Sequence, residues 1–151
     1  MLVKADMYAA GGGTLKDIIR DKVFNGEYTE ICTFTPYSSR CTINEAKAVA
    51  DTANHKVYVY IDLNNLFDYT TGAEWVNMMT VNNLSNQYLP IYATSSRDNS
   101  LPLITDEESA NPLLQFAFGY VSSVGMRLYT GYGQKFNSGE RYIMYATYSY
   151  K

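Results

Sequence analysis

Alternating apolar and polar residues predict that most of this chain forms β-strands. The clearest alternation covers residues 56–63, and the final segment, 140–150, alternates throughout its length. In the first of these, the predicted aliphatic face consists of Val57, Val59, Ile61 and Leu63, and the opposite face of Tyr58, Tyr60 and Asp62. Further strands are predicted at 28–35, 113–121 and 126–130, and turns at 36–40, 131–133 and 137–139.

One short segment near the N-terminus has helical rather than strand spacing. Its apolar residues recur at intervals of three and four, at Leu15, Ile18, Ile19 and Val23. Thr14 can cap the start of this helix, and Asn25-Gly26 is a stop signal at its end. The pattern therefore predicts a helix over residues 14–24.

Residues 45–50 carry conflicting signals. Thr42 and Glu45 have the spacing of a helical capping box, and the residues that follow are good helix formers. However, the clear strand at 56–63 lies only five residues further on, and residues 51–55 suit a hairpin loop. We therefore favour a strand at 45–50 that pairs with 56–63.

The predicted elements suggest an all-β, antiparallel β-sandwich, jelly-roll-like, with one short N-terminal helix. Residues 64–112 read as loop-rich, because they are rich in Asn, Ser and Thr and contain Pro90, Pro102 and Pro112. We expect residues 14–151 to form a single domain. Residues 1–13, which end in three glycines, would form a flexible or docking arm.

The composition adds a surplus of tyrosine. The 151 residues include 15 Tyr, 6 Phe and 1 Trp, whereas only 18% are charged and the formal net charge is -3. Nucleic-acid binding needs a basic surface, which this balance does not suggest. No apolar run approaches about 18 residues, so no membrane insertion is expected. Tyrosine suits half-buried strands, subunit interfaces and sugar-binding surfaces.

Catalytic and metal-binding signals are weak. The only histidine, His55, lies in a predicted turn, and Cys32 and Cys41 are expected to be buried free thiols. We therefore predict no catalytic residues, no metal site and no cofactor. A small glycan-active hydrolase stays open as an alternative, since paired carboxylates could be drawn from Asp62, Asp68, Glu74 and residues 106–108.

The tyrosine surplus supplies the candidate binding residues. Aromatic rings in predicted loops are candidates for contact with a ligand, and they are Tyr37, Tyr69, Trp75, Tyr92 and Tyr132. Tyrosines on the two most regular strands are candidates for an oligomer interface, and they are Tyr58, Tyr60, Tyr142, Tyr148 and Tyr150.

Residues 30–150 resemble the head domains of phage tail-fibre and baseplate receptor-binding proteins. The resemblance rests on loose patterns of Gly, Pro and alternation at 48–51, 57–61, 101–102, 116–121, 125–129, 138–140 and 146–148. It implies a homotrimeric virion module without enzymatic activity, docked on other virion or tail proteins. Such a module would be assembled in the host cytoplasm and would bind a host-surface glycan or protein. A second alternative is a purely structural role in virion assembly or capsid decoration.

Overall fold

The structure is a computed structural model, and it describes residues 14–70, 75–89, 98–111, 115–121, 123–129 and 135–151. These residues are mostly in antiparallel strands, with one α-helix, which confirms the predicted all-β class with a short helix. The elements in chain order are α1 (Leu15–Asn25), β1 (Thr29–Glu30), β2 (Thr33–Pro36), β3 (Cys41–Asp51), β4 (Lys56–Asn65), β5 (Tyr69–Thr70), β6 (Trp75–Asn82), the 3₁₀ turn η2 (Asn86–Tyr88), β7 (Asp98–Thr105), β8 (Gln115–Val121), β9 (Ser123–Tyr129), β10 (Lys135–Phe136) and β11 (Arg141–Ser149).

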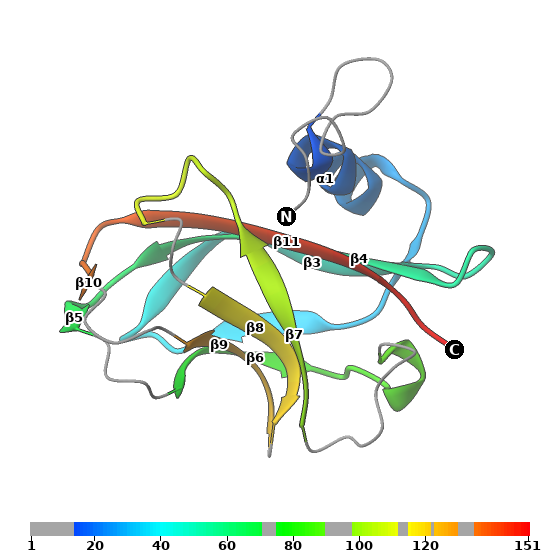
Figure 1. Ribbon diagram of the computed structural model, residues 1–151. Helices are drawn as coiled ribbons and strands as arrows, with labels where there is room; N and C mark the ends of the chain where they lie inside the picture. The colour runs from blue at the N-terminus through cyan, green and yellow to red at the C-terminus, as the bar shows by residue number, and fades with distance from the viewer. Residues whose placement is uncertain (1–13, 71–74, 90–97, 112–114, 122, 130–134) are drawn as a thin grey trace.

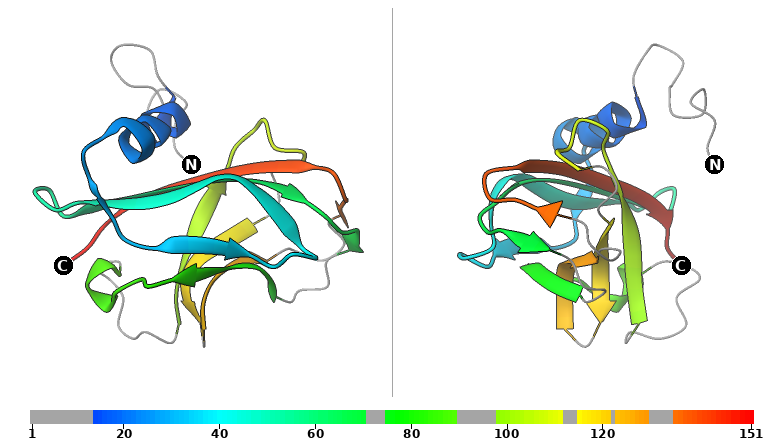
Figure 2. Two further views of the ribbon diagram at one scale, coloured as in Figure 1. Left: turned by 180° about the vertical axis from the view of Figure 1, so that it is seen from behind. Right: turned by 60° about the vertical axis from the view of Figure 1, so that its left-hand side comes forward.

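Nine of the strands form one sheet in the order β1-β3-β4-β11-β7-β8-β9-β6-β2. Strand β7 pairs with β11 at only two register positions, whereas it pairs with β8 along most of its length. The sheet therefore bends at β7, and its two halves face each other as two layers (Figures 1 and 2). This is the layered β architecture that the alternation predicts, while the jelly-roll connectivity stays a prediction.

The main core lies between the two layers. Strand β4 contributes its odd-numbered apolar residues and β11 its even-numbered residues, as their alternation predicts. The largest side chains that are almost completely buried in this core are Tyr142, Phe116, Phe136, Ile61, Leu63, Met78 and Met79. Burial of this apolar surface is the main favourable contribution to folding.

Helix α1 covers the outer face of the layer that contains β3, β4 and β11 (Figures 1 and 2). Its buried residues Ile19 and Val23 belong to a second apolar cluster with Val49, Tyr60, Ile143 and Tyr145. The helix begins as predicted, because the Thr14 side chain accepts a hydrogen bond from the Asp17 backbone N–H at 3.2 Å. As a result, β4 and β11 bury side chains on both of their faces.

The predicted strand at 45–50 is confirmed and extends over the whole of β3. Ten residues of β3 pair with residues of β4, and this long-range pairing stabilises the strand more than the local sequence favours a helix. The predicted strand at 28–35 is instead split into β1 and β2, with residues 31–32 between them.

The loop-rich interpretation of residues 64–112 is wrong for β6 and β7, each of eight residues. A register shift between Asn77 and Met79 places both Met78 and Met79 in the core, so strict alternation is lost in β6. In β7, Pro102 lies opposite Ala117 of β8 within the sheet, although proline normally argues against a paired strand.

The packing of α1 can be tested by truncating its buried face. We expect Ile19→Ala to lower the free energy of unfolding by about 2–5 kcal/mol, because Ile19 is 1% exposed and the alanine would leave a cavity. The exposed Asp21, on the opposite side of the same helix turn, provides the control Asp21→Ala, with an expected effect within about 0.5 kcal/mol. Urea denaturation followed by circular dichroism measures both, and equal effects would show that α1 is not docked on the sheet.

Candidate functional site

Four of the five tyrosines proposed for an oligomer interface are buried inside the chain. Tyr142, Tyr148 and Tyr150 lie in the main core, and Tyr60, only 3% exposed, lies beneath α1. Tyr58 is partly buried beside Tyr28 and the Lys22 ammonium group. These four tyrosines are therefore packing residues of the subunit interior. Alternation along β11 and the residue after it turns Tyr142, Tyr148 and Tyr150 inward, and helix α1 covers Tyr60. Their rings pack within one subunit and do not form an open contact face.

The predicted ligand-binding aromatics are placed less uniformly. Tyr37 is 42% exposed in the turn after β2, and Tyr69 is partly buried in β5. Trp75 is the first residue of β6, whereas Tyr92 and Tyr132 lie outside the described residues. The turn that holds Tyr37 and the segment that holds Tyr69 meet at one end of the molecule, because Arg40 contacts the Phe67 ring. The small β5–β10 sheet lies at this end, at the left of Figure 1.

Two loops meet at this end through backbone hydrogen bonds. The Arg40 N–H donates to the Tyr37 carbonyl at 2.8 Å, and the Leu66 N–H donates to the Arg40 carbonyl at 2.9 Å. Leu66 is as exposed as Tyr37, at 42%. We call the surface formed by Tyr37, Arg40, Leu66, Phe67 and Tyr69 the tip surface.

Phe67 connects the tip surface to the core. Its ring centroid lies 5.5 Å from that of Phe136, which is completely buried, and 6.0 Å from that of Tyr69. On its other side, the Arg40 guanidinium carbon lies 5.2 Å from the Phe67 ring centroid, a cation–π contact. The ring therefore supports a cationic side chain at the surface.

Asn65, which is completely buried, fixes the backbone beneath the tip surface. Its side-chain amide donates to the carbonyls of Phe67 and Asn137, and its side-chain oxygen accepts from the Phe67 N–H at 3.4 Å. Its backbone groups bond to Gly139 and Glu140 in the turn before β11. Sequence reasoning missed this residue. The signal was present, because Asn65 continues the odd-numbered inward series of β4 with a polar side chain.

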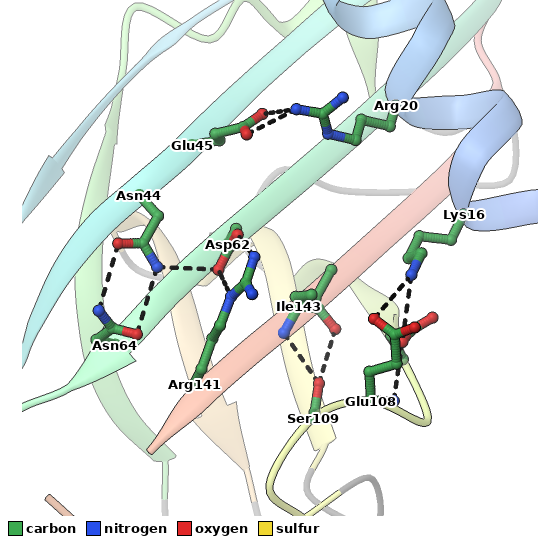
Figure 3. Close-up of polar contacts among 11 residues, drawn as sticks. Lys16, Arg20, Asn44, Glu45, Asp62, Asn64, Glu108, Ser109, Arg141 and Ile143 are labelled. Atoms are coloured by element: carbon green, nitrogen blue, oxygen red, sulfur yellow. Dashed lines mark hydrogen bonds and ion pairs between the residues drawn. The ribbon is translucent and has the colours of Figure 1, made fainter. Parts of the chain in front are cut away.

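A second polar cluster lies on the outer face of the sheet beside α1 (Figure 3). The Asp62 carboxylate is 2% exposed and accepts hydrogen bonds from Arg141 Nε at 2.9 Å and from Asn44 Nδ2 at 3.0 Å. Burial alone would raise the pKa of Asp62, but the hydrogen bonds from Arg141 and Asn44 and the charge of Arg141 outweigh it and lower this pKa.

Further ion pairs hold α1 against this face. Arg20 bonds Glu45 at 2.7 Å, and the Lys16 ammonium lies 3.3 Å from Glu108 and 3.6 Å from Asp106 (Figure 3). The cluster is thus satisfied within the chain. An Asp62 carboxyl with a lowered pKa stays ionised at neutral pH, whereas the general acid of a glycosidase needs a raised pKa. Glu74, its proposed partner in the hydrolase alternative, lies outside the described residues.

The remaining chemically interesting side chains are engaged in packing. Cys32 and Cys41 are buried free thiols, as expected, and burial raises their pKa to about 12 and about 11 respectively. His55 is exposed in the β3–β4 turn, where its ring stacks on Tyr150 with centroids 5.1 Å apart. Within the described ranges, no group of three or more His, Cys, Asp or Glu side chains is arranged to hold a metal ion.

Comparison of the chain with models of known protein families, with curated proteins and with solved structures finds no match. In the part of the chain that the structure describes, no helix has the length and apolar character needed to cross a membrane.

The Asp62–Arg141 pair predicts a specific dependence of stability on pH. The pKa of Asp62 is lower in the folded state than in the unfolded state. The ionised Asp62 therefore adds to the free energy of unfolding above its unfolded-state pKa, and this stabilisation is lost as pH falls through its folded-state pKa. We expect Arg141→Ala to reduce the free energy of unfolding by about 1–3 kcal/mol near pH 7, since it leaves a buried carboxylate without its cation. The free energies of unfolding of wild type and variant should become equal as the pH is lowered toward about 2, where Asp62 is protonated in both.

The comparison variant is Arg20→Ala, which removes a half-exposed ion pair and contacts with the rings of Phe24 and Tyr60. The charge of Arg20 lowers the pKa of Asp62 less than Arg141 does, so Arg20→Ala should change the pH dependence less than Arg141→Ala. Chemical denaturation of all three proteins across the pH range gives the comparison. A loss of stability in Arg141→Ala that does not depend on pH would contradict the assignment of an ionised, buried Asp62.

Proposed function

We propose that this chain is a non-catalytic binding module whose tip surface contacts a glycan or protein on a host cell. The observation that carries the proposal is the exposure of Tyr37 and Leu66 on two loops that are hydrogen-bonded to Arg40, whose guanidinium lies over the Phe67 ring. Three large hydrophobic residues are prominently exposed among the described residues, Tyr37, Leu66 and Ile104. Two of the three therefore belong to the tip surface.

The chemistry of the tip surface suits weak recognition of sugars. An exposed aromatic ring offers an apolar face to the C–H groups of a sugar at low cost in side-chain entropy, and its hydroxyl can hydrogen-bond. A guanidinium adds donors for sugar oxygens. Asn65 supports the tip surface from beneath, and Phe67 of this surface packs on the buried Phe136, so less side-chain and loop entropy would be lost on binding.

The wider setting that we propose is the head of a phage tail-fibre or other virion protein, with jelly-roll-like connectivity and three copies per assembly. A homotrimer would present three tip surfaces, and linkage would raise the overall affinity without any new contact. The resemblance of residues 30–150 to such heads and the antiparallel, layered fold support this proposal. Since four of the tyrosines are buried, contacts between copies would use other surfaces.

The direct test is binding of Tyr37→Ala to immobilised bacterial surface polysaccharides and to intact bacterial cells. We expect binding to fall by about tenfold or more, because a central aromatic contact typically contributes over about 1.4 kcal/mol. The fold should be unaffected, since the hydrogen bonds that Tyr37 makes with Met78, Arg40 and Cys41 all come from its backbone. Ile104→Ala is the matched control, because Ile104 is similarly exposed, at 40%, but lies on β7.

Equal binding by wild type and Tyr37→Ala would contradict the assignment of the tip surface. A wild-type protein that assembles with virion components but binds neither polysaccharide nor cells would favour the purely structural role. The mass in solution, measured by light scattering, tests the trimer separately, and a monomer would remove the avidity mechanism.

A further inference from the structure

We propose that the tip surface recognises a negatively charged substituent, a carboxylate or a phosphate, on the bound glycan, and that Arg40 is the residue that contacts it. This inference rests on the proposed function, because it specifies the ligand of the same surface. It starts from a difference between Arg40 and the other described arginine side chains.

The other described arginine side chains are neutralised within the chain. Arg20 is paired with Glu45, and Arg141 with Asp62 (Figure 3). Lys16, next to them, lies within ion-pair distance of two carboxylates. In contrast, no carboxylate among the described residues lies within ion-pair distance of Arg40.

The carboxylates in the neighbouring loops are occupied by other donors. Asp68 accepts a hydrogen bond from the Ser138 backbone N–H at 2.9 Å. Glu140 accepts from the Asn137 side-chain amide at 3.1 Å and from the Tyr142 hydroxyl at 2.9 Å. These bonds hold the turn beneath the tip surface. Both carboxylates are thus bonded to groups in or next to that turn and do not pair with Arg40.

Arg40 is also held in place before any ligand arrives. Its backbone N–H and carbonyl are both hydrogen-bonded, to Tyr37 and Leu66 respectively. Its guanidinium rests on the ring of Phe67, which packs on the buried Phe136. A guanidinium that stacks on a ring keeps N–H groups in its own plane for two parallel bonds to a carboxylate or phosphate. Fixing it in advance reduces the entropy lost on binding.

The same surface supplies contacts for the rest of such a ligand. The backbones of Tyr37 and Leu66 are both hydrogen-bonded to the backbone of Arg40, and both residues are exposed. An acidic sugar unit combines an apolar ring face with a charged group at its edge, which matches an exposed tyrosine beside a fixed guanidinium. We therefore expect binding to weaken as ionic strength rises, because part of the attraction is between the ligand's charge and the partly buried Arg40 at the protein surface.

The experiment compares each bacterial polysaccharide of a panel in three forms: untreated, with its carboxyl groups reduced to alcohols, and with its phosphates removed by hydrofluoric acid. We expect wild type to bind at least one untreated polysaccharide about tenfold or more tightly than one of its treated forms. The treatment that abolishes binding identifies the group as carboxylate or phosphate. Arg40→Gln should bind the untreated and treated forms equally, while Arg40→Lys should keep a reduced preference.

Lys56→Gln is the matched control, because it removes one positive charge from an exposed residue at the opposite end of β4. It should bind as wild type does. The thermal midpoint of each variant is measured alongside, and if Arg40→Gln lowers it, the charge-retaining Arg40→Lys variant decides the outcome through its reduced preference.

The two proposals fail in different ways. Binding that depends on Tyr37 but is equal for charged and neutral forms would overturn the anionic ligand and leave the binding module intact. A charge preference shared by wild type, Arg40→Gln and Arg40→Lys would place the anionic contact elsewhere and overturn the role of Arg40. If the wild-type protein bound neither polysaccharides nor cells, both proposals would be overturned.

Discussion

Strands β4 and β11 bury side chains on both faces, and the core, the helix and the turns at both ends are arranged around them. One face of each strand fills the space between the two layers, and the other supports α1. These strands therefore carry apolar or aromatic residues in most positions, and buried tyrosines fill several of them. Tyrosine offers a large ring for packing, but its hydroxyl needs a polar partner when it is buried.

Those hydroxyl partners connect the core to the ends of the molecule. The Tyr142 hydroxyl donates to Glu140, which also fixes Asn137, and Asn65 joins that turn to the loop that carries Phe67. At the opposite end, the Tyr148 hydroxyl donates to the Tyr88 carbonyl, and Tyr150 stacks on His55. The tip surface is thus held in place by the hydrogen bonds that satisfy the buried polar groups at this end of the core. A support of this kind reduces the entropy that the proposed binding surface would lose when it takes up a ligand.

Much of the fold could be predicted from local pattern, because β4, β11 and α1 each combine a clear periodicity with a buried face. Strands β6 and β7 could not, since the bulge at Met78–Met79 and the proline at 102 depend on pairing partners that are distant in sequence. The same reason explains the candidate site. The exposure of Tyr37 follows from its turn, but the inward placement of Tyr142 and the cover over Tyr60 depend on the layers and the helix. The burial of Asn65 follows from its place in the inward series of β4, but its hydrogen-bond partners depend on the turn before β11, and the contact of Arg40 with Phe67 depends on two loops that are distant in sequence.

Nitration of tyrosines in the native protein with tetranitromethane, followed by peptide mass spectrometry, distinguishes tyrosines that build the interior from those left at the surface. The reagent attacks the exposed phenolate, and burial raises the pKa of Tyr60, Tyr142 and Tyr145, with the Glu140 hydrogen bond adding to the effect at Tyr142. We expect rapid nitration of Tyr37, which is 42% exposed, and protection of those three until the protein is unfolded. Nitration of Tyr142 or Tyr60 in the folded protein at the rate of Tyr37 would show that these rings are not part of a packed interior.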